Sequence, residues 1–195
     1  MPKIRANECE FYYEERGRGQ EPLLFLNGIL QSTESWHPYL DAFGKDFRVL
    51  LHDFRGQLMS EKPDQKYSME MHAEDVKDLM DELGYGSAHI VGTSYGSEVG
   101  MILSYKYPER VKTLSVIAGI SEHDERTRGF SKIWRIGARL AYQHGYKKEF
   151  YDFLEPIIFS PEFIDENRKE LDERRNQLSD FSDKFFVVFE RLVDA

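Results

Sequence analysis

Short apolar runs alternate with amphipathic helical patterns between residues 20 and 119, and this alternation constrains the fold more than any other feature of the sequence. The runs PLLFLNG, FRVLLHDF, SAHIVG and VKTLSVIAG are typical of strands covered on both faces. Between them, STESWHPYLDAFGKD, SMEMHAEDVKDLMDELG and YGSEVGMILSYKY carry apolar residues at helical spacing. Such alternation predicts βαβ units with right-handed crossovers, and hence an α/β fold with a mostly parallel sheet.

The regions on either side of this pattern differ from it. IRANECEFYYEERGRGQEP predicts a strand pair that turns at Asn7-Glu8. Beyond Gly119 there is no strand pattern, and the helical patterns include SPEFIDENRKELDERRNQL, with Ser160 as N-cap, and DFSDKFFVVFERLVDA, with a predicted apolar stripe of Phe181, Phe185, Phe189 and Leu192. We therefore expect a core over residues 1–120 and a helical lid, or cap, over residues 121–195.

Composition limits the compartment and the partners. The 35 acidic and 26 basic side chains give a net charge of −9, which disfavours binding to nucleic acid or to an anionic membrane. Cys9 is the single cysteine, so an internal disulfide is excluded and a reducing compartment is favoured. The sequence shows neither a signal-peptide pattern nor an apolar run of membrane-spanning length. These features predict a cytoplasmic protein with no nucleic-acid or membrane partner.

The stretch AHIVGTSYGSEVG places Ser94 between Gly92 and Gly96, at the junction of a predicted strand and a predicted helix. A serine nucleophile in this setting occupies a strained corner that projects its hydroxyl, and bulky side chains at 92 and 96 would collide there. The positive end of the following helix also favours a developing oxyanion. We predict that Ser94 is a catalytic nucleophile. The alternatives are an inert serine in a glycine-rich turn and a phosphate cradle, although the lysine that usually follows such a cradle is missing.

Several segments around this serine resemble the α/β-hydrolase superfamily, in its serine-nucleophile branch, over residues 20–120. FLNGILQSTESW is similar to the strand and loop that carry the oxyanion hole, HDFRGQLMSEKP to the D-x-R-G-x-G-x-S segment, and YPERVKTLSVIAG to the strand after the nucleophile. The resemblance implies that the backbone N–H groups of Ile29 and Tyr95 hold the oxyanion and that no cofactor is needed. Two positions depart from the family pattern: Asn27 replaces a histidine, and Leu58 replaces a glycine, where a left-handed backbone would be strained.

The resemblance also implies an acid and then a histidine after the serine. Only His123 and His144 follow Ser94. His123 and Asp124, in GISEHDER, are candidates for the base and the acid, although His123 also fits a solvated loop. His52, within a predicted strand, is expected to be a hydrogen-bonded group of the core or its rim, and no histidine spacing predicts a metal site. We expect that this chain lacks the last strands of the fold together with the base and the acid, and that the isolated chain is inactive or impaired.

Together these features predict an esterase-like serine hydrolase that acts on a small or medium apolar ester or acyl compound. Serine at the corner differs from the aspartate of the haloalkane dehalogenase and epoxide hydrolase branches. The alternative is a non-catalytic ligand-binding or signalling protein on a truncated scaffold of the same kind. Without later neighbours, the strand VKTLSVIAG is expected to form an apolar sheet edge, so that the isolated chain either pairs with another copy through this edge, as a homodimer, or is poorly soluble.

Overall fold

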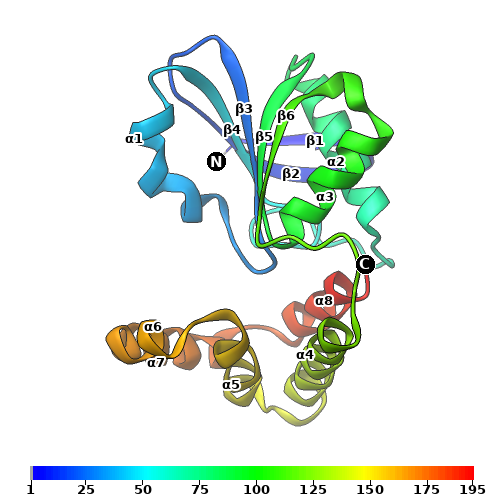
Figure 1. Ribbon diagram of the computed structural model, residues 1–195. Helices are drawn as coiled ribbons and strands as arrows, with labels where there is room; N and C mark the ends of the chain where they lie inside the picture. Colours follow the sequence, from blue (N-terminus) through cyan, green and yellow to red (C-terminus); the bar gives the residue numbers. More distant parts are fainter. Residues whose placement is uncertain (1) are drawn as a thin grey trace. The chain divides into compact units, whose positions relative to one another are not determined.

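The computed structural model describes residues 2–195 and divides the chain into two compact units (Figure 1). The first unit ends at Glu122, and the second runs from His123 to Ala195.

Strands and helices alternate in the first unit as the sequence predicts. Its elements are β1 (Lys3–Ala6), β2 (Cys9–Arg16), β3 (Glu21–Leu26), η1 (Thr33–Tyr39), α1 (Leu40–Phe43), β4 (Phe47–His52), α2 (Met69–Glu82), β5 (Ala88–Thr93), α3 (Tyr95–Lys106), η2 (Pro108–Arg110) and β6 (Val111–Ile117). The sheet order is β1-β2-β4-β3-β5-β6. Strands β4, β3, β5 and β6 are parallel, whereas β1 and β2 are antiparallel to their neighbours. Helix α1 lies on one face of the sheet, and α2 and α3 lie on the other (Figure 1), so the predicted mostly parallel α/β fold is confirmed.

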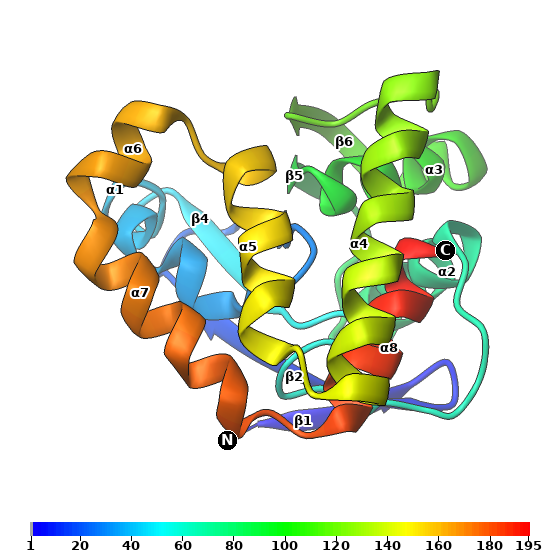
Figure 2. The ribbon, with the colours of Figure 1, turned by 90° about the horizontal axis from the view of Figure 1, so that it is seen from below.

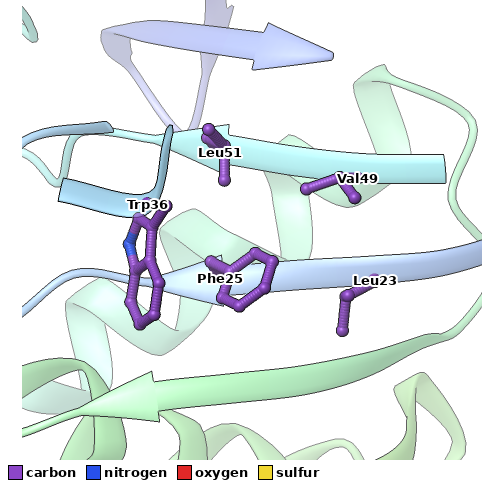
Figure 3. Close-up of a cluster of buried hydrophobic side chains, with 5 residues drawn as sticks. All are labelled: Leu23, Phe25, Trp36, Val49 and Leu51. Atoms are coloured by element: carbon purple, nitrogen blue, oxygen red, sulfur yellow. The ribbon is translucent and has the colours of Figure 1, made fainter. Parts of the chain in front are cut away.

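An aromatic and aliphatic cluster fills the face of the sheet that α1 covers. Leu23 and Phe25 of β3 lie beside Val49 and Leu51 of β4, because alternate residues of a strand point to the same face (Figure 3). Trp36 of η1 packs on this cluster, with its ring centroid 4.5 Å from that of Phe25. This packing fixes the loop that leads from β3 into η1.

The helix expected around Trp36 and Phe43 is for the most part a 3-10 helix, η1, followed by the single α-helical turn α1. Pro38 lies inside η1 and has no backbone N–H to donate, which interrupts regular α-helical hydrogen bonding. Gly44 follows the turn as its C-cap.

A buried ion pair joins three segments of the first unit. Arg55 donates from Nε to Asp75 Oδ2 at 2.8 Å and from Nη2 to Asp75 Oδ1 at 2.6 Å. The turn of the β1–β2 hairpin completes the group, because the Asn7 carbonyl accepts from Arg55 at 2.7 Å and the Asn7 amide donates to Asp75 at 2.7 Å. Arg55 and Asp75 are 3% and 1% exposed, so each charge depends on these partners for the solvation that water no longer supplies.

The second unit is helical throughout its regular structure. Its elements are α4 (Glu125–His144), α5 (Lys147–Ile158), α6 (Pro161–Glu166), α7 (Arg168–Gln177), η3 (Leu178–Asp180) and α8 (Asp183–Val193). Helix α4 packs beside α8 and α5 (Figure 2), and Phe150 contacts the rings of Phe186 and Phe189 at the centre. No helix within residues 2–195 combines the length and apolarity needed to cross a bilayer.

The apolar stripe predicted for the last helix is only partly right. Phe189 and Leu192 are buried as expected, but Phe186 is buried as well, whereas Phe181 and Phe185 are half-buried. Phe185 instead makes edge-to-face contacts with Phe181 and Phe186. The buried side of α8 therefore differs from the predicted stripe, because Phe186 and Phe189 both pack against Phe150 of α5.

Candidate active site

Ser94 occupies a sharp corner between β5 and α3. Its backbone angles are φ 48° and ψ −119°, which L-residues rarely adopt. The Ser94 N–H donates to the Ile117 carbonyl of β6 at 2.8 Å, and its carbonyl accepts from Ser97 at 2.8 Å and from Glu98 at 3.2 Å. The side chain is half-buried and makes no hydrogen bond with any residue of the described part of the chain. The strained corner that the sequence predicts is therefore present, and no hydrogen bond to another described residue engages the Ser94 hydroxyl.

Glycine is required on both sides of this corner. A Cβ atom at Gly92 would lie 2.6 Å from the Gly96 carbonyl oxygen and 2.7 Å from Ser97 Cα. A Cβ atom at Gly96 would lie 2.3 Å from the Leu26 carbonyl oxygen. The collisions expected at both positions therefore exist, and Gly96 also allows α3 to approach the end of β3.

The loop after β3 contains the second backbone amide of the candidate oxyanion hole. Gln31 N donates to the Gly28 carbonyl at 3.2 Å, which closes a turn in which Leu30 has φ 62°. The Gln31 side chain accepts from Gly28 N at 2.8 Å. Within residues 2–195 the amides of Ile29 and Tyr95 donate to no protein acceptor, so both remain available to a ligand oxygen.

Asn27 holds this loop through its side chain. It is fully buried; its Oδ1 accepts from Trp36 Nε1 at 2.7 Å and its Nδ2 donates to the His52 carbonyl at 2.9 Å. Asn27 has no left-handed backbone angle, so its contribution is hydrogen bonding. Leu58, the other departure from the family pattern, has φ 33°, and this position therefore carries the expected strain.

Two buried carboxylates that the sequence analysis missed support the same loop. Asp53 accepts from Thr33 N and from Met59 N, each at 3.0 Å. Burial raises the pKa of Asp53, while these two amides oppose the rise. Glu14 accepts from the Thr33 hydroxyl at 2.6 Å; burial raises its pKa, but hydrogen bonds from Thr33 and Tyr12 outweigh that effect and the net pKa is lowered. Asp53 follows directly after a buried strand, and that position was the signal available in the sequence.

Behind the corner lies a cluster of buried rings. His72 lies 5.4 Å from the ring of Tyr95 and 5.5 Å from that of Phe54, and Phe54 lies 4.9 Å from His52, all between centroids. Neither imidazole nitrogen of His52 or of His72 has a hydrogen-bond partner within the described residues. His52 therefore lies in the core, as expected, but the expectation that it is hydrogen-bonded is wrong, because aromatic rings enclose it.

This burial makes stability depend on pH. Burial lowers the pKa of His52 to about 4, and burial, with the charge of Arg55 adding to it, lowers the pKa of His72 to about 3. The Asp75 carboxylate lies 3.8 Å from His72 but is engaged by Arg55. An imidazole in the unfolded chain has a pKa near 6.5, so as the pH falls below 6.5 the unfolded state binds protons that the folded state does not.

We expect the free energy of unfolding to fall by up to about 1.4 kcal/mol per pH unit for each of these imidazoles between pH 6.5 and 4. Burial also raises the pKa of Glu98 to about 7, which acts in the opposite direction. The test is therefore the difference between the wild type and His72→Leu in urea unfolding at several pH values. The wild type should lose stability more steeply than the variant, and parallel curves would contradict the prediction.

Glu98 lies one helical turn after Ser94, to whose carbonyl its N–H donates at 3.2 Å. Its side chain is half-buried, and this burial raises the pKa of the Glu98 carboxyl. The sequence analysis did not single out this residue.

The first unit also contains a cavity of about 320 Å³ beside the corner. Its lining is mostly apolar and includes Thr93, the neighbour of Ser94, and Gln31 of the turn that presents Ile29: Phe25, Gln31, Ser35, Trp36, Tyr39, Phe43, Val91, Thr93 and Ile117. This volume lies at the lower end of the range of small-molecule sites.

The candidates for the base and the acid lie in the second unit. His123 is exposed in an irregular segment, and His144 is exposed in the last turn of α4. Asp124 is the N-cap of α4: its Oδ1 accepts from Thr127 N and from the Thr127 hydroxyl, each at 2.7 Å. These hydrogen bonds lower the pKa of Asp124, and through them Asp124 caps the N-terminus of α4. Across residues 2–195 no group of three or more His, Cys, Asp or Glu side chains is arranged to hold a metal ion.

Comparison with known proteins identifies the family. A family model described as the alpha/beta hydrolase fold matches residues 21–147. RutD of Azorhizobium caulinodans, named as a candidate carbamate hydrolase, is 28% identical over 179 residues, which is 91% of this chain and 65% of that protein. Epoxide hydrolase 4 of Mus musculus is 30% identical over 118 residues, 59% of this chain and 33% of that protein.

Among solved structures, MGS-M2, an alpha/beta hydrolase enzyme from a Medee basin deep-sea metagenome library, superposes with a TM-score of 0.89 at 26% identity, covering 99% of this chain and 70% of that one. The chain thus spans about two thirds of the first of these curated relatives and a third of the second. With the sheet order, the corner at Ser94 and the family match in agreement, the chain belongs to the α/β-hydrolase fold family.

Proposed function

We propose that this protein is a serine hydrolase that cleaves a small or medium apolar ester or acyl compound, with Ser94 as its nucleophile. The observation that carries the proposal is the backbone of Ser94, at φ 48° and ψ −119°, at the start of α3. A non-glycine residue is held in such a conformation only where the surrounding structure imposes it, and strain of this kind gathers at functional sites.

The proposed chemistry is acyl transfer. The Ser94 oxygen attacks the carbonyl carbon of the substrate, and the resulting oxyanion accepts hydrogen bonds from the amides of Ile29 and Tyr95. Both amides lack protein acceptors within the described residues, and the positive end of α3 adds to their effect. The apolar cavity of about 320 Å³ beside Thr93 supports a small apolar acyl group.

A base must accept the Ser94 proton and later return it to the leaving group. No histidine within residues 2–195 is hydrogen-bonded to Ser94, and the two buried imidazoles face ring edges. We therefore propose that residues 1–195 by themselves are inactive or impaired.

The same observation favours the second candidate, a non-catalytic protein that binds a ligand on this scaffold. In that case the corner and its two amides would bind an anionic or carbonyl oxygen without turnover. The two candidates differ in whether Ser94 becomes covalently modified.

A fluorophosphonate probe tests the proposal directly. We expect a single phosphonyl adduct on a folded polypeptide that contains these residues together with the base, on the tryptic peptide that runs from Asp78 to Lys106, with fragmentation placing it on Ser94 and not on Ser87, Ser97 or Ser104. Protein unfolded in urea is the control and should remain unlabelled, because reactivity depends on the oxyanion hole. An adduct on another serine, or equal labelling after unfolding, would contradict the assignment of Ser94. Residues 1–195 and a longer polypeptide that contains them are labelled in parallel. Labelling of Ser94 in the longer form alone would indicate that residues 1–195 lack the base, whereas no labelling of Ser94 in either form would indicate that it is not the nucleophile.

A further inference from the structure

The side chain of Gln31 lies directly against Gly28, the residue before Ile29. Its Oε1 accepts from Gly28 N at 2.8 Å, and the Gln31 N–H donates to the Gly28 carbonyl at 3.2 Å. A Cβ atom at Gly28 would lie 2.9 Å from Gln31 Oε1 and 3.1 Å from Gln31 Cδ, so this close contact depends on a glycine at position 28. Gln31 therefore engages both the N–H and the carbonyl group of Gly28.

These two hydrogen bonds fix the direction of the Ile29 N–H. The Gly28 carbonyl and the Ile29 N–H belong to one peptide group, which is planar and trans, so the two point in opposite directions. The bond that holds the carbonyl inside the turn therefore directs the Ile29 N–H out of it. Glycine has the widest choice of backbone angles of any residue, so without these bonds the peptide group after Gly28 would rotate more freely.

Gln31 is itself held by its neighbours. It directly precedes Ser32, the N-cap of η1, whose side chain accepts from Glu34 N at 3.3 Å. The Gln31 carbonyl accepts from Asn27 Nδ2 at 3.4 Å, and Asn27 is in turn bonded to Trp36 of η1. The Gln31 side chain thus reaches from an anchored stretch of backbone to a glycine with few constraints of its own.

We propose that Gln31 is a positioning residue for the oxyanion hole: its side-chain amide holds Gly28 so that the Ile29 N–H stays directed at the substrate oxygen. This inference rests on the proposed function, because it requires the Ile29 N–H to contact the oxyanion. A donor that is oriented before the reaction stabilises the oxyanion without the cost of reorganisation. A neutral acceptor also suits the position, since a carboxylate there would repel the charge that develops on the substrate.

Turnover of p-nitrophenyl butyrate by a longer polypeptide that contains residues 1–195 tests this role. Gln31→Met keeps the length of the side chain and removes the acceptor. We expect kcat to fall about tenfold or more and KM to change less than about threefold, because the Ile29 N–H acts mainly in the transition state. Gln65→Met is the matched control: Gln65 is exposed and donates to Met71 Sδ at 3.4 Å, so turnover should be unchanged. Equal kcat for the wild type and Gln31→Met would overturn the inference.

Gln31→Glu separates the hydrogen bond from the charge. The carboxylate still accepts from Gly28 N, but its charge opposes the oxyanion, so kcat at neutral pH should be about tenfold or more below that of the wild type. The ratio of variant to wild-type kcat should rise as the pH falls from about 8 to about 5 and the introduced carboxyl begins to gain its proton. Taking the ratio removes the titration of the base. A ratio that does not change with pH would contradict the proposed position of this side chain.

Amide hydrogen exchange, followed by NMR, tests the geometry without relying on turnover. The Gly28 amide should exchange about tenfold or more faster in Gln31→Met than in the wild type, and within about threefold of the wild type in Gln31→Glu, which keeps the acceptor. The Ile29 amide has no protein acceptor within residues 2–195 and should exchange rapidly in all three. Unchanged protection of Gly28 in Gln31→Met would show that the side chain does not hold this peptide group.

Ser94→Ala, assayed beside these variants, separates the inference from the proposed function. If the wild type and Ser94→Ala turn over equally, the proposed function fails and the role of Gln31 fails with it. If Ser94→Ala is inactive and Gln31→Met is as active as the wild type, the role of Gln31 alone is refuted. Loss of kcat in both variants, with the exchange result expected for Gly28, supports both proposals.

Discussion

A Ser94→Ala variant is expected to lose at least about 10³-fold in kcat/KM for p-nitrophenyl butyrate, which corresponds to about 4 kcal/mol of transition-state stabilisation. The reason is that alanine cannot form the acyl-enzyme bond, while the two oxyanion amides and the cavity remain in place. The side chain of Ser94 makes no hydrogen bond within residues 2–195, so its removal should leave the fold unchanged.

Ser104→Ala is the matched control for this experiment. Ser104 lies on the same helix and donates only to the Gly100 carbonyl at 2.8 Å, so its loss should leave turnover unchanged. The assay is run on residues 1–195 and on a longer polypeptide that contains them, and we expect measurable turnover in the longer form. Equal turnover by the wild type and Ser94→Ala in that form would refute the nucleophile assignment.

The second large effect is structural. Gly96→Ala should destabilise the first unit by about 3 kcal/mol or more, because its Cβ atom would lie 2.3 Å from the carbonyl oxygen and 2.5 Å from the carbonyl carbon of Leu26. These are backbone atoms of β3 and cannot rotate away as a side chain would. Relief requires α3 to move off the sheet, which would also carry the Tyr95 amide away from the corner.

Urea unfolding in a Trp134→Phe background measures this effect, since Trp36 is then the single tryptophan and reports on the first unit. Gly86→Ala is the control: a Cβ atom there meets no atom within 4 Å, and its stability should change by less than about 0.5 kcal/mol. If both variants unfold at the same urea concentration, the close approach of α3 to β3 does not constrain the fold as described.

Local patterning was sufficient to predict most of the fold. The alternation of apolar runs with amphipathic patterns was enough to predict strands β3, β4, β5 and β6 and helices α2 and α3. A strand that is covered on both faces needs a continuous apolar run, which can be recognised in the sequence. The hairpin turn at Asn7 and Glu8 was also readable, and both residues have positive φ. The segment around Pro38 was not, since propensity alone did not separate a 3-10 helix from an α-helix.

The candidate site was predictable where the backbone dictates residue type and unpredictable where distant residues meet. Gly92 and Gly96 are required by contacts within a few residues of Ser94 and across to β3. The hydrogen bonds from Thr33 to Asp53 and Glu14 connect segments about 20 residues apart, and no local sequence pattern predicts such contacts. His52 shows the same limit: the sequence places it in a strand, but only the packed structure reveals that rings surround it.

The hairpin turn at Asn7 also bears on how the protein can be shortened or tagged. Its carbonyl and side-chain amide touch Arg55 and Asp75, two charges sealed from water. Trimming the first eight residues would remove Ile4 and Ala6 from the apolar cluster that they form with Cys9, Phe11 and Leu79. It would also leave the buried side chains of Arg55 and Asp75 without the hydrogen-bond partners that Asn7 supplies. Expression trials that begin the polypeptide at Cys9 should therefore yield aggregated material, whereas fusions joined ahead of Lys3 leave the hydrogen bonds of Asn7 intact.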